Sequence, residues 1–342
     1  MKRITSILVL CLLMIGSVLF VVTYDLLELG QTAAQQDSFF TYLENQQVTR
    51  LTIESDFSEL IDNRDKKIKK DASIRLENEE GILNQFPIQI SLRGKSRREL
   101  CDFPPLKFRF DDELLNSVGW NAAFDDYKLV THCLNNSESV LKEFLVYQLY
   151  NQLTDYSFKV HVMEVIYVDR NGVMEPVRQY GFFLESYSEM AQRLFAKKMP
   201  DQLSSTTKVP KEDYQRLALF QYMIGNTDWN LYRQHNIKWL RIENADIPVP
   251  YDFDASGLVN APYAKPHPSL PIGTVQERFL QYRGGDLQDL DNKRAEIHQK
   301  EQAFIRILEE CPALSQEEKQ EMLNYLGDFF AMGQIAVSNH PQ

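Results

Sequence analysis

The chain has 342 residues, of which 44% are hydrophobic and 25% charged, and its net charge is −11 at neutral pH. This length suits two domains of ordinary size, or one unit of two lobes with a cleft between them, and the composition is that of a globular protein. A phosphate backbone would be repelled over most of so acidic a surface, so we do not expect a nucleic-acid-binding protein.

The first 34 residues have the features of an export signal or membrane anchor. Lys2 and Arg3 precede an apolar run from Ile7 to Val22, and the first acidic residue is Asp25. This order of charges predicts that the N-terminus stays in the cytoplasm while the rest of the chain is exported, as in a bacterial envelope protein. The run is intermediate between a signal peptide and a full span, and no small-residue cleavage motif follows it directly. We favour an uncleaved anchor in the membrane, whereas cleavage would give a periplasmic or extracellular protein.

Three of the four cysteines lie outside the apolar run, namely Cys101, Cys133 and Cys311. An exported protein folds where disulfides form, so an odd number leaves at least one free thiol. Cys101 and Cys133 belong to the same predicted lobe and lie beside predicted strands. We favour a bridge between them over two buried free thiols, and we expect their Cα atoms to be about 4.4–6.8 Å apart.

Short segments of alternating polar and apolar residues occupy the first half of the chain. Each predicts a strand with one buried face. The segments are residues 47–54, 72–78, 86–93, 106–110, 127–134, 158–168 and 178–185, with a turn at Asn171 and Gly172 before the last.

Helical patterns dominate the second half, after a first strong helix that begins at Ser137 with leucines at four-residue spacing. Further helices are expected at residues 211–225, ended by Gly225, at 286–310, and at 315–334, capped by Ser315. Strands first and helices second predict an α+β protein. Its strand-rich N-terminal lobe would span residues 35–185, and its helical C-terminal lobe residues 186–342.

Residues of the types that phosphoryl transfer needs follow one another along the chain. A lysine must neutralise phosphate oxygens, a glutamate positions that lysine, and an aspartate orients the attacking hydroxyl, while an amide and a second carboxylate hold Mg²⁺ through oxygen. The chain offers, in this order, Lys107, Glu143, Asp228, Asn236 and Asp252. Asp254 lies two residues after Asp252, on the same side of an extended chain, where like charges repel unless a cation offsets them.

Longer stretches around these residues resemble a known family. The segments GNTDWN (225–230), HNIK (235–238) and PVPYDFD (248–254) look like the catalytic core of the CotH-like spore-coat kinases, atypical protein kinases distantly related to the HipA toxins. Upstream, ISLRGKSRRELCDFPPLKFRF (90–110) resembles the segment of that family that covers the nucleotide phosphates and ends with the phosphate-binding lysine. The resemblance covers roughly residues 86–260.

The resemblance implies a two-lobed atypical protein-kinase-like fold. It also implies an enzyme that uses ATP with Mg²⁺ or Mn²⁺ to phosphorylate Ser, Thr or Tyr hydroxyls of a protein substrate. The catalytic residues would be Asp228 and Lys107, and the metal ligands Asn236, Asp252 and Asp254. The nucleotide would contact Arg93, Gly94, Lys107, Glu143, Glu185 and Tyr187, the last two in the hinge that meets adenine. The chain departs from the family at Lys95, where the family has asparagine.

Two other interpretations of the same residues remain open. The chain can be a catalytically inactive binding or scaffold module of the envelope, because ATP is scarce outside the cytosol. It can also be a metal-dependent hydrolase that uses His235, His267, Asp252 and Asp254, although the histidine spacing fits no compact ligand motif. Each polar residue taken singly also fits a surface or turn role.

Overall fold

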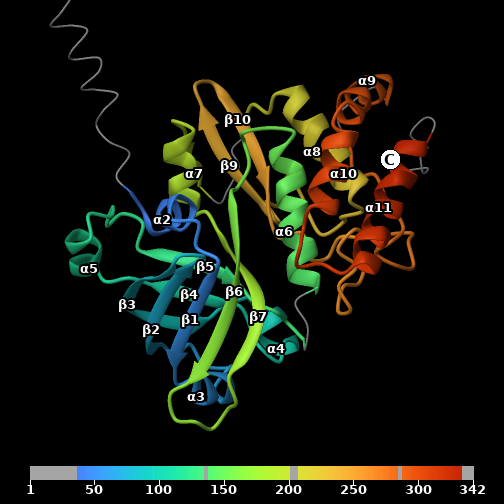
Figure 1. Ribbon diagram of the computed structural model, residues 1–342. Coiled ribbons are helices and arrows are strands. Elements are labelled where there is room, and N and C mark those ends of the chain that lie inside the picture. Colours follow the sequence, from blue (N-terminus) through green and yellow to red (C-terminus); the bar gives the residue numbers. More distant parts are fainter. Residues whose placement is uncertain (1–36, 95, 135–137, 201–206, 284–286, 333–342) are drawn as a thin grey trace, which may run out of the picture.

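The computed structural model describes residues 37–94, 96–134, 138–200, 207–283 and 287–332. The predicted export signal or anchor over residues 1–34 lies outside this part of the chain, as do Lys95 and Ser137. Among the described residues, no helix has both the length and the apolar character needed to span a membrane. Figure 1 shows the strands of the first half at the lower left and most of the helices of the second half at the upper right.

Strands from the first half of the described chain form a closed, seven-stranded barrel with the order β1-β2-β3-β4-β5-β7-β6. They are β1 (Arg50–Ser55), β2 (Lys70–Asn78), β3 (Gly81–Leu92), β4 (Leu106–Arg109), β5 (Asp126–Val130), β6 (Val160–Asp169) and β7 (Val177–Leu184). Neighbouring strands are antiparallel except for β1 and β6, which are parallel. This parallel ladder, in which Leu51 pairs with Val165, closes the barrel.

The closed barrel corrects the prediction of fold class. The sequence leads us to expect a two-lobed, atypical protein-kinase-like α+β fold with an N-terminal strand-rich lobe and a C-terminal helical lobe, and this expectation is wrong. The strands instead form a closed mixed barrel, and helices occur along the whole described chain. Alternating polarity identifies strands and their buried faces, but it does not specify which strands pair. Here β1 pairs with the nearby β2 and also with β6, where Arg50 meets the distant Glu164.

Apolar side chains on alternate strand positions fill the barrel. Phe108, Tyr127 and Phe183 are at most 1% exposed. Helix α2 (Phe39–Asn45) lies at one end of the barrel (Figure 1) and inserts Phe39, whose ring centroid is 5.1 Å from that of Phe183. Burial of one such side chain contributes about 1.5–3 kcal/mol, so this aromatic cluster is a major part of the barrel core.

Short helices connect the strands, namely α3 (Phe57–Asp62), α4 (Ser96–Leu100), α5 (Asp112–Ser117) and α7 (Tyr187–Arg193). The predicted bridge between Cys101 and Cys133 is confirmed, with Cα atoms 4.4 Å apart. It joins the end of α4 to the segment after β5. Cys311 is a buried free thiol.

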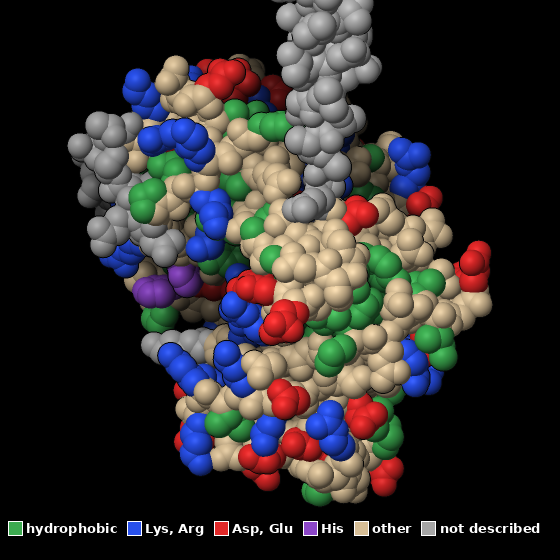
Figure 2. Space-filling view, turned by 90° about the vertical axis from the view of Figure 1, so that its left-hand side faces the viewer, with side chains coloured by type: hydrophobic (Ala, Val, Ile, Leu, Met, Phe, Trp, Pro, Cys, Tyr) green, Lys and Arg blue, Asp and Glu red, His purple; other side chains and the backbone are tan. Residues whose placement is uncertain are grey.

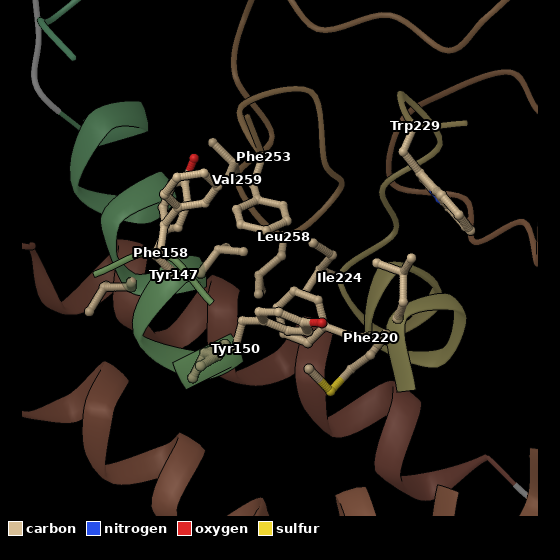
Figure 3. Packing of buried hydrophobic residues seen from close by; sticks show 14 of the residues in the cluster. Tyr147, Tyr150, Phe158, Phe220, Ile224, Trp229, Phe253, Leu258 and Val259 are labelled. Carbon is tan, nitrogen blue, oxygen red and sulfur yellow. The ribbon is translucent and has the colours of Figure 1, made fainter. Parts of the chain in front are cut away.

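Helix α6 (Glu138–Asn151) lies between the barrel and the helices of the second half (Figure 1). Its Tyr150 packs against Phe220 of α8 (Lys211–Met223), with ring centroids 4.6 Å apart. One turn earlier, Tyr147 packs against Phe253 at 4.7 Å. In Figure 3 these aromatic residues form one cluster between α6, α8 and the segment around Leu258. The cluster therefore anchors the segment after residue 250 against α6.

A small antiparallel sheet follows α7 and α8, with β8 (Lys197–Lys198), β9 (Ile237–Ile242) and β10 (Ala245–Pro250) in the order β10-β9-β8. The last helices of the described part of the chain are α9 (Leu287–His298), α10 (Glu301–Glu309) and α11 (Gln316–Ala331). The single helix predicted at 286–310 is therefore two helices, separated at Gln299 and Lys300. The predicted cap at Ser315 is confirmed, because its Oγ accepts a hydrogen bond from Glu318 N at 3.2 Å.

Candidate active site

The loop after α8 carries Asp228 and turns back into β9. Gly225 ends the helix with φ +66°, a left-handed conformation that glycine adopts at little cost. Asn226 Oδ1 then accepts a hydrogen bond from Asp228 N at 2.9 Å. Further on, Asn230 and His235 exchange two backbone hydrogen bonds of 3.0 Å. These contacts fix the loop at both of its ends.

Asn236 and His235 hold the carboxylate of Asp228. Asn236 Nδ2 donates to Asp228 O at 2.7 Å and to Asp228 Oδ2 at 3.0 Å. His235 Nε2 lies 2.8 Å from Asp228 Oδ1. The side chain of Asp228 is nevertheless 49% exposed, so it is oriented by its neighbours and still open to a ligand.

Asp252 follows β10 and is tied to both α6 and the Asp228 loop. Its N–H donates to Tyr147 Oη at 2.9 Å, and the preceding Tyr251 N–H donates to Asn236 O at 3.1 Å. The Asp252 carboxylate itself has no hydrogen bond or ion pair within the described part of the chain. Burial, followed by the negative charge of Asp254, raises the pKa of Asp252 above its usual range.

Asp254 belongs to a buried cluster with Arg97 and Glu143. Arg97 Nη1 is 3.5 Å from Glu143 Oε2, and Arg97 Nε is 3.6 Å from Asp254 Oδ2. Asp254 also accepts a hydrogen bond from Tyr263 Oη at 3.0 Å. Burial raises the pKa of Glu143, while the positive charge of Arg97 opposes this shift. In this cluster the positive charge of one guanidinium is shared between two carboxyl groups.

Several polar atoms of this cluster lack hydrogen bonds. Arg97 is 9% exposed and Glu143 is 1% exposed. Within the described residues, Nε and Nη2 of Arg97 and Oε2 of Glu143 are buried without a hydrogen-bond partner. Leaving such groups unsatisfied costs about 1–3 kcal/mol each, so the arrangement is suited to a polar ligand or ordered water at this position.

The predicted pairing of Lys107 with Glu143 is not formed. Lys107 Nζ is 3.0 Å from Asp126 Oδ2, and its side chain is 41% exposed. Its cross-strand partner Lys128 lies on the same face of the barrel and interacts electrostatically with Asp252. Burial, then the charges of Arg93 and Lys238, lower the pKa of Lys128 to about 8, while Asp252 has the opposite effect.

A cavity of about 240 Å³ adjoins Lys128. Its walls include Lys238, Tyr251 and residues 184–188, which contain the predicted hinge residues Glu185 and Tyr187. The Glu185 carboxylate is already bound, by Arg193 Nε at 2.8 Å and Lys159 N at 3.1 Å. Figure 2 shows Lys and Arg side chains together with Asp and Glu side chains around the hollow between the barrel and the upper part of the molecule, with histidine side chains at its edge.

Arg93 and Gly94 follow β3 on the same side of the molecule. Arg93 N donates to Pro105 O at 2.8 Å, and Gly94 has φ +79°. The charge of Arg93 contributes to the pKa shifts of Lys128 and Asp252. The structure thus brings together Arg93, Glu143, Asp228, Asn236, Asp252 and Asp254, with Glu185 and Tyr187 at the neighbouring cavity. Lys107 is paired with Asp126, which lines that cavity, and not with Glu143.

Lys128 and Arg97 are the residues that sequence reasoning missed. The sequence did contain an indication of Lys128. This lysine lies between Tyr127 and Leu129, which are buried, on a predicted strand, so alternation predicts that its side chain faces outward from the sheet. Arg97 belongs to a basic cluster visible in the sequence. Its burial had no local signal, because it depends on α4 packing near Glu143 and Asp254.

No protein-family model matches the sequence, and the search of curated proteins found no match. Within the described residues, no group of three or more His, Cys, Asp or Glu side chains is arranged as metal ligands. The predicted ligand set contains only two carboxylates, with the amide of Asn236 as the third member.

Proposed function

We propose that the protein is an ATP- and Mg²⁺-dependent phosphotransferase that transfers a phosphoryl group to a hydroxyl acceptor. The observation that carries this proposal is that Asn236 bonds Asp228 through its side chain and Tyr251, the residue before Asp252, through its backbone oxygen, next to a cavity lined by Lys128, Lys238 and two tyrosines. The acidic residues of the cavity wall, Asp125, Asp126 and Glu185, are paired with Arg109, Lys107 and Arg193. Phosphoryl transfer depends almost entirely on positioning and on charge stabilisation, and these groups can provide both.

The cavity beside Lys128 fits a nucleotide in its chemistry. Tyr187 and Tyr251 provide aromatic surface for a planar base, and Lys128 and Lys238 provide positive charge for phosphates. Lys238 Nζ already lies 5.6 Å from the ring centroid of Tyr187, so the basic and aromatic walls are in contact. In this arrangement Lys128 takes the role that the sequence assigns to Lys107.

Asp252, Asp254 and Asn236 fit a hard divalent cation. The Asp252 carboxylate has no partner among the described residues, and burial beside Asp254 disfavours its ionised form unless a cation is present. Asn236 uses its amide nitrogen for Asp228, which leaves Oδ1 as an oxygen donor. Such oxygen ligands are those that Mg²⁺ prefers, and the bound cation would neutralise phosphate charge.

Asp228 is the residue that we assign to the acceptor hydroxyl. Its carboxylate is held by Asn236 and His235 but is half exposed, so one side is available to a substrate. A carboxylate in this position can accept the hydroxyl proton and orient the attacking oxygen. The guanidinium of Arg97 offsets the negative charges of Asp254 and Glu143.

A transfer assay tests this proposal. The purified full-length protein is incubated with ATP and Mg²⁺ or Mn²⁺, and mass spectrometry detects phosphate gained by the protein itself or by added acceptors. We expect phosphate transfer that stops when the metal is chelated. Nucleotide binding without any transfer would support the inactive binding module instead, and the absence of both would contradict a nucleotide-dependent function altogether.

A further inference from the structure

A second cavity, of about 450 Å³, lies against the loop that carries Asp228. Trp229, the residue after Asp228, is part of its wall. Gln281, also in the wall, donates from Nε2 to the backbone oxygen of Thr227 at 2.7 Å. In Figure 3, Trp229 lies at the edge of the buried cluster that contains Tyr150. The wall of the cavity therefore includes the residue after Asp228, to which we assign the acceptor hydroxyl.

Aromatic rings make up much of this cavity. They belong to Tyr214, Trp229, Tyr232, Phe279 and Tyr282. Tyr214 and Tyr282 contact each other with ring centroids 5.0 Å apart, so these two rings form one aromatic surface. Tyr232 is 62% exposed, so part of the surface is open to a ligand.

Polar atoms with unused hydrogen-bonding capacity lie among these rings. Trp229 is 4% exposed, and its Nε1 is a buried donor without a partner in the described part of the chain. Asn230 accepts Arg233 N–H through Oδ1 at 2.8 Å, which leaves the donors on Nδ2. Gln281 donates from Nε2, which leaves Oε1 as an acceptor. The wall thus offers both hydrogen-bond donors and an acceptor.

The charges of the lining residues limit which ligands the cavity can bind. Among the described residues that line it, Arg283 alone is charged, and none is acidic. A basic peptide would find no counter-charge in this cavity. A sugar ring has apolar faces that pack against aromatic side chains, and each of its hydroxyls both donates and accepts a hydrogen bond.

We propose that this cavity binds the acceptor and that the acceptor is a saccharide, with a pyranose ring against the aromatic wall and one hydroxyl directed to Asp228. This inference rests on the proposed function. In the transfer, the hydroxyl oxygen forms a bond to the γ-phosphorus, and the bond between that phosphorus and the β–γ bridging oxygen breaks. ADP leaves with the electron pair, and the hydroxyl proton passes to the Asp228 carboxylate.

Saturation-transfer NMR on the full-length protein with ADP and Mg²⁺ tests the inference. The probes are glucose, N-acetylglucosamine and glucuronate, and a serine-containing peptide serves as competitor. We expect saturation of ring protons for at least one sugar, and about tenfold weaker binding in Tyr232→Ala, which removes an exposed ring from the wall. The matched control is Phe195→Ala, which removes a 97% exposed aromatic ring outside this cavity and should leave sugar binding unchanged.

Each outcome decides the proposal. The proposal is overturned if no sugar probe shows saturation of its ring protons. It is also overturned if the sugar binds wild type and Tyr232→Ala equally well. Displacement of the sugar by the peptide, with phosphate transferred to serine, also overturns it and assigns the cavity to a protein acceptor. Nucleotide binding is measured separately by calorimetry. Sugar binding without nucleotide binding would therefore contradict the phosphotransferase while supporting the saccharide site.

Discussion

Asn236 connects the two aspartates that we consider essential. Its side chain bonds Asp228, and its backbone oxygen accepts a hydrogen bond from Tyr251, the residue before Asp252. The two carboxylates nevertheless have different surroundings. Asp228 is held by two neighbours and is half exposed, whereas the Asp252 carboxylate lies beside Asp254 without a partner of its own among the described residues.

This difference predicts different effects of Asp228→Asn and Asp252→Asn. Asp228→Asn should lower the transfer rate by about 10²–10⁴-fold while Mg-nucleotide binding stays close to wild type, because a proton acceptor matters mainly in the transition state. Asp252→Asn should weaken metal-dependent binding itself by about tenfold or more, because a neutral amide offsets less cation charge. Calorimetry gives the affinities, and mass spectrometry gives the transfer. Near-wild-type phosphorylation in both variants would contradict these roles.

Lys128 makes nucleotide affinity depend on pH. Because the pKa of Lys128 is lowered to about 8, its side chain is charged below that pH and becomes neutral above it. Affinity for Mg-nucleotide should therefore fall by about tenfold as pH rises from about 7 to about 9.5, as a charge-assisted hydrogen bond to phosphate is lost.

The control for this pH dependence is Lys128→Arg, whose guanidinium stays charged over the same range. Calorimetric titration of the variant should give a flatter profile than wild type. An identical fall of affinity in both proteins would show that another group is responsible and would remove Lys128 from the phosphate site.

At the scale of single elements, the end of α8 determines where the Asp228 loop begins. Gly225 has φ +66°, and a Cβ added there would lie 2.0 Å from Tyr325 Oη. Gly225→Ala should therefore destabilise the protein by about 1–3 kcal/mol, through the left-handed backbone and the contact with Tyr325. The matched control is Gly327→Ala within α11, where an added Cβ meets nothing within 4 Å and alanine is the better helix former. Chemical denaturation should show a loss for the first variant and no loss for the second.

The bridge between Cys101 and Cys133 holds the helix that presents Arg97. Cys101 N donates to Arg97 O at 2.9 Å, and Asp102 N donates to Cys133 O at 2.8 Å, so α4 is fixed at its C-terminal end. The two cysteines are 32 residues apart. The bridge lowers the conformational entropy of the unfolded chain by closing this loop, so replacement of both cysteines by serine should lower the free energy of unfolding by about 3–4 kcal/mol.

The same double serine variant should also bind Mg-nucleotide more weakly, because Arg97 would no longer be fixed between Glu143 and Asp254. Denaturation and calorimetry measure the two effects, and Cys311→Ser, which removes a buried free thiol elsewhere, is the control. Nucleotide affinity that is unaffected by loss of the bridge would show that α4 does not need this restraint.

At the scale of the whole molecule, local sequence patterns predicted individual elements, but they did not predict which distant segments pair with one another. Alternation located the strands, a serine cap located α11, and the run of polar residues from Asp228 to Asp254 located the candidate site. Closure of the barrel was not predictable in this way, because β1 meets β6 through residues that are far apart in the chain. The same applies to Arg97, whose partners Glu143 and Asp254 lie on distant segments, and to the choice between Lys107 and Lys128, which share one face of the barrel.

The central claim is that Asp228, Asn236 and Asp252 form a metal–nucleotide site beside the cavity at Lys128. Its most direct test is isothermal titration of the full-length protein with ATP, once with Mg²⁺ and once with EDTA. We predict saturable binding at one site in the presence of Mg²⁺, weakened by about tenfold or more when the metal is chelated, because Asp252 and Asp254 would then repel the phosphates. Absence of binding under both conditions, or equal binding with and without the metal, would contradict the claim.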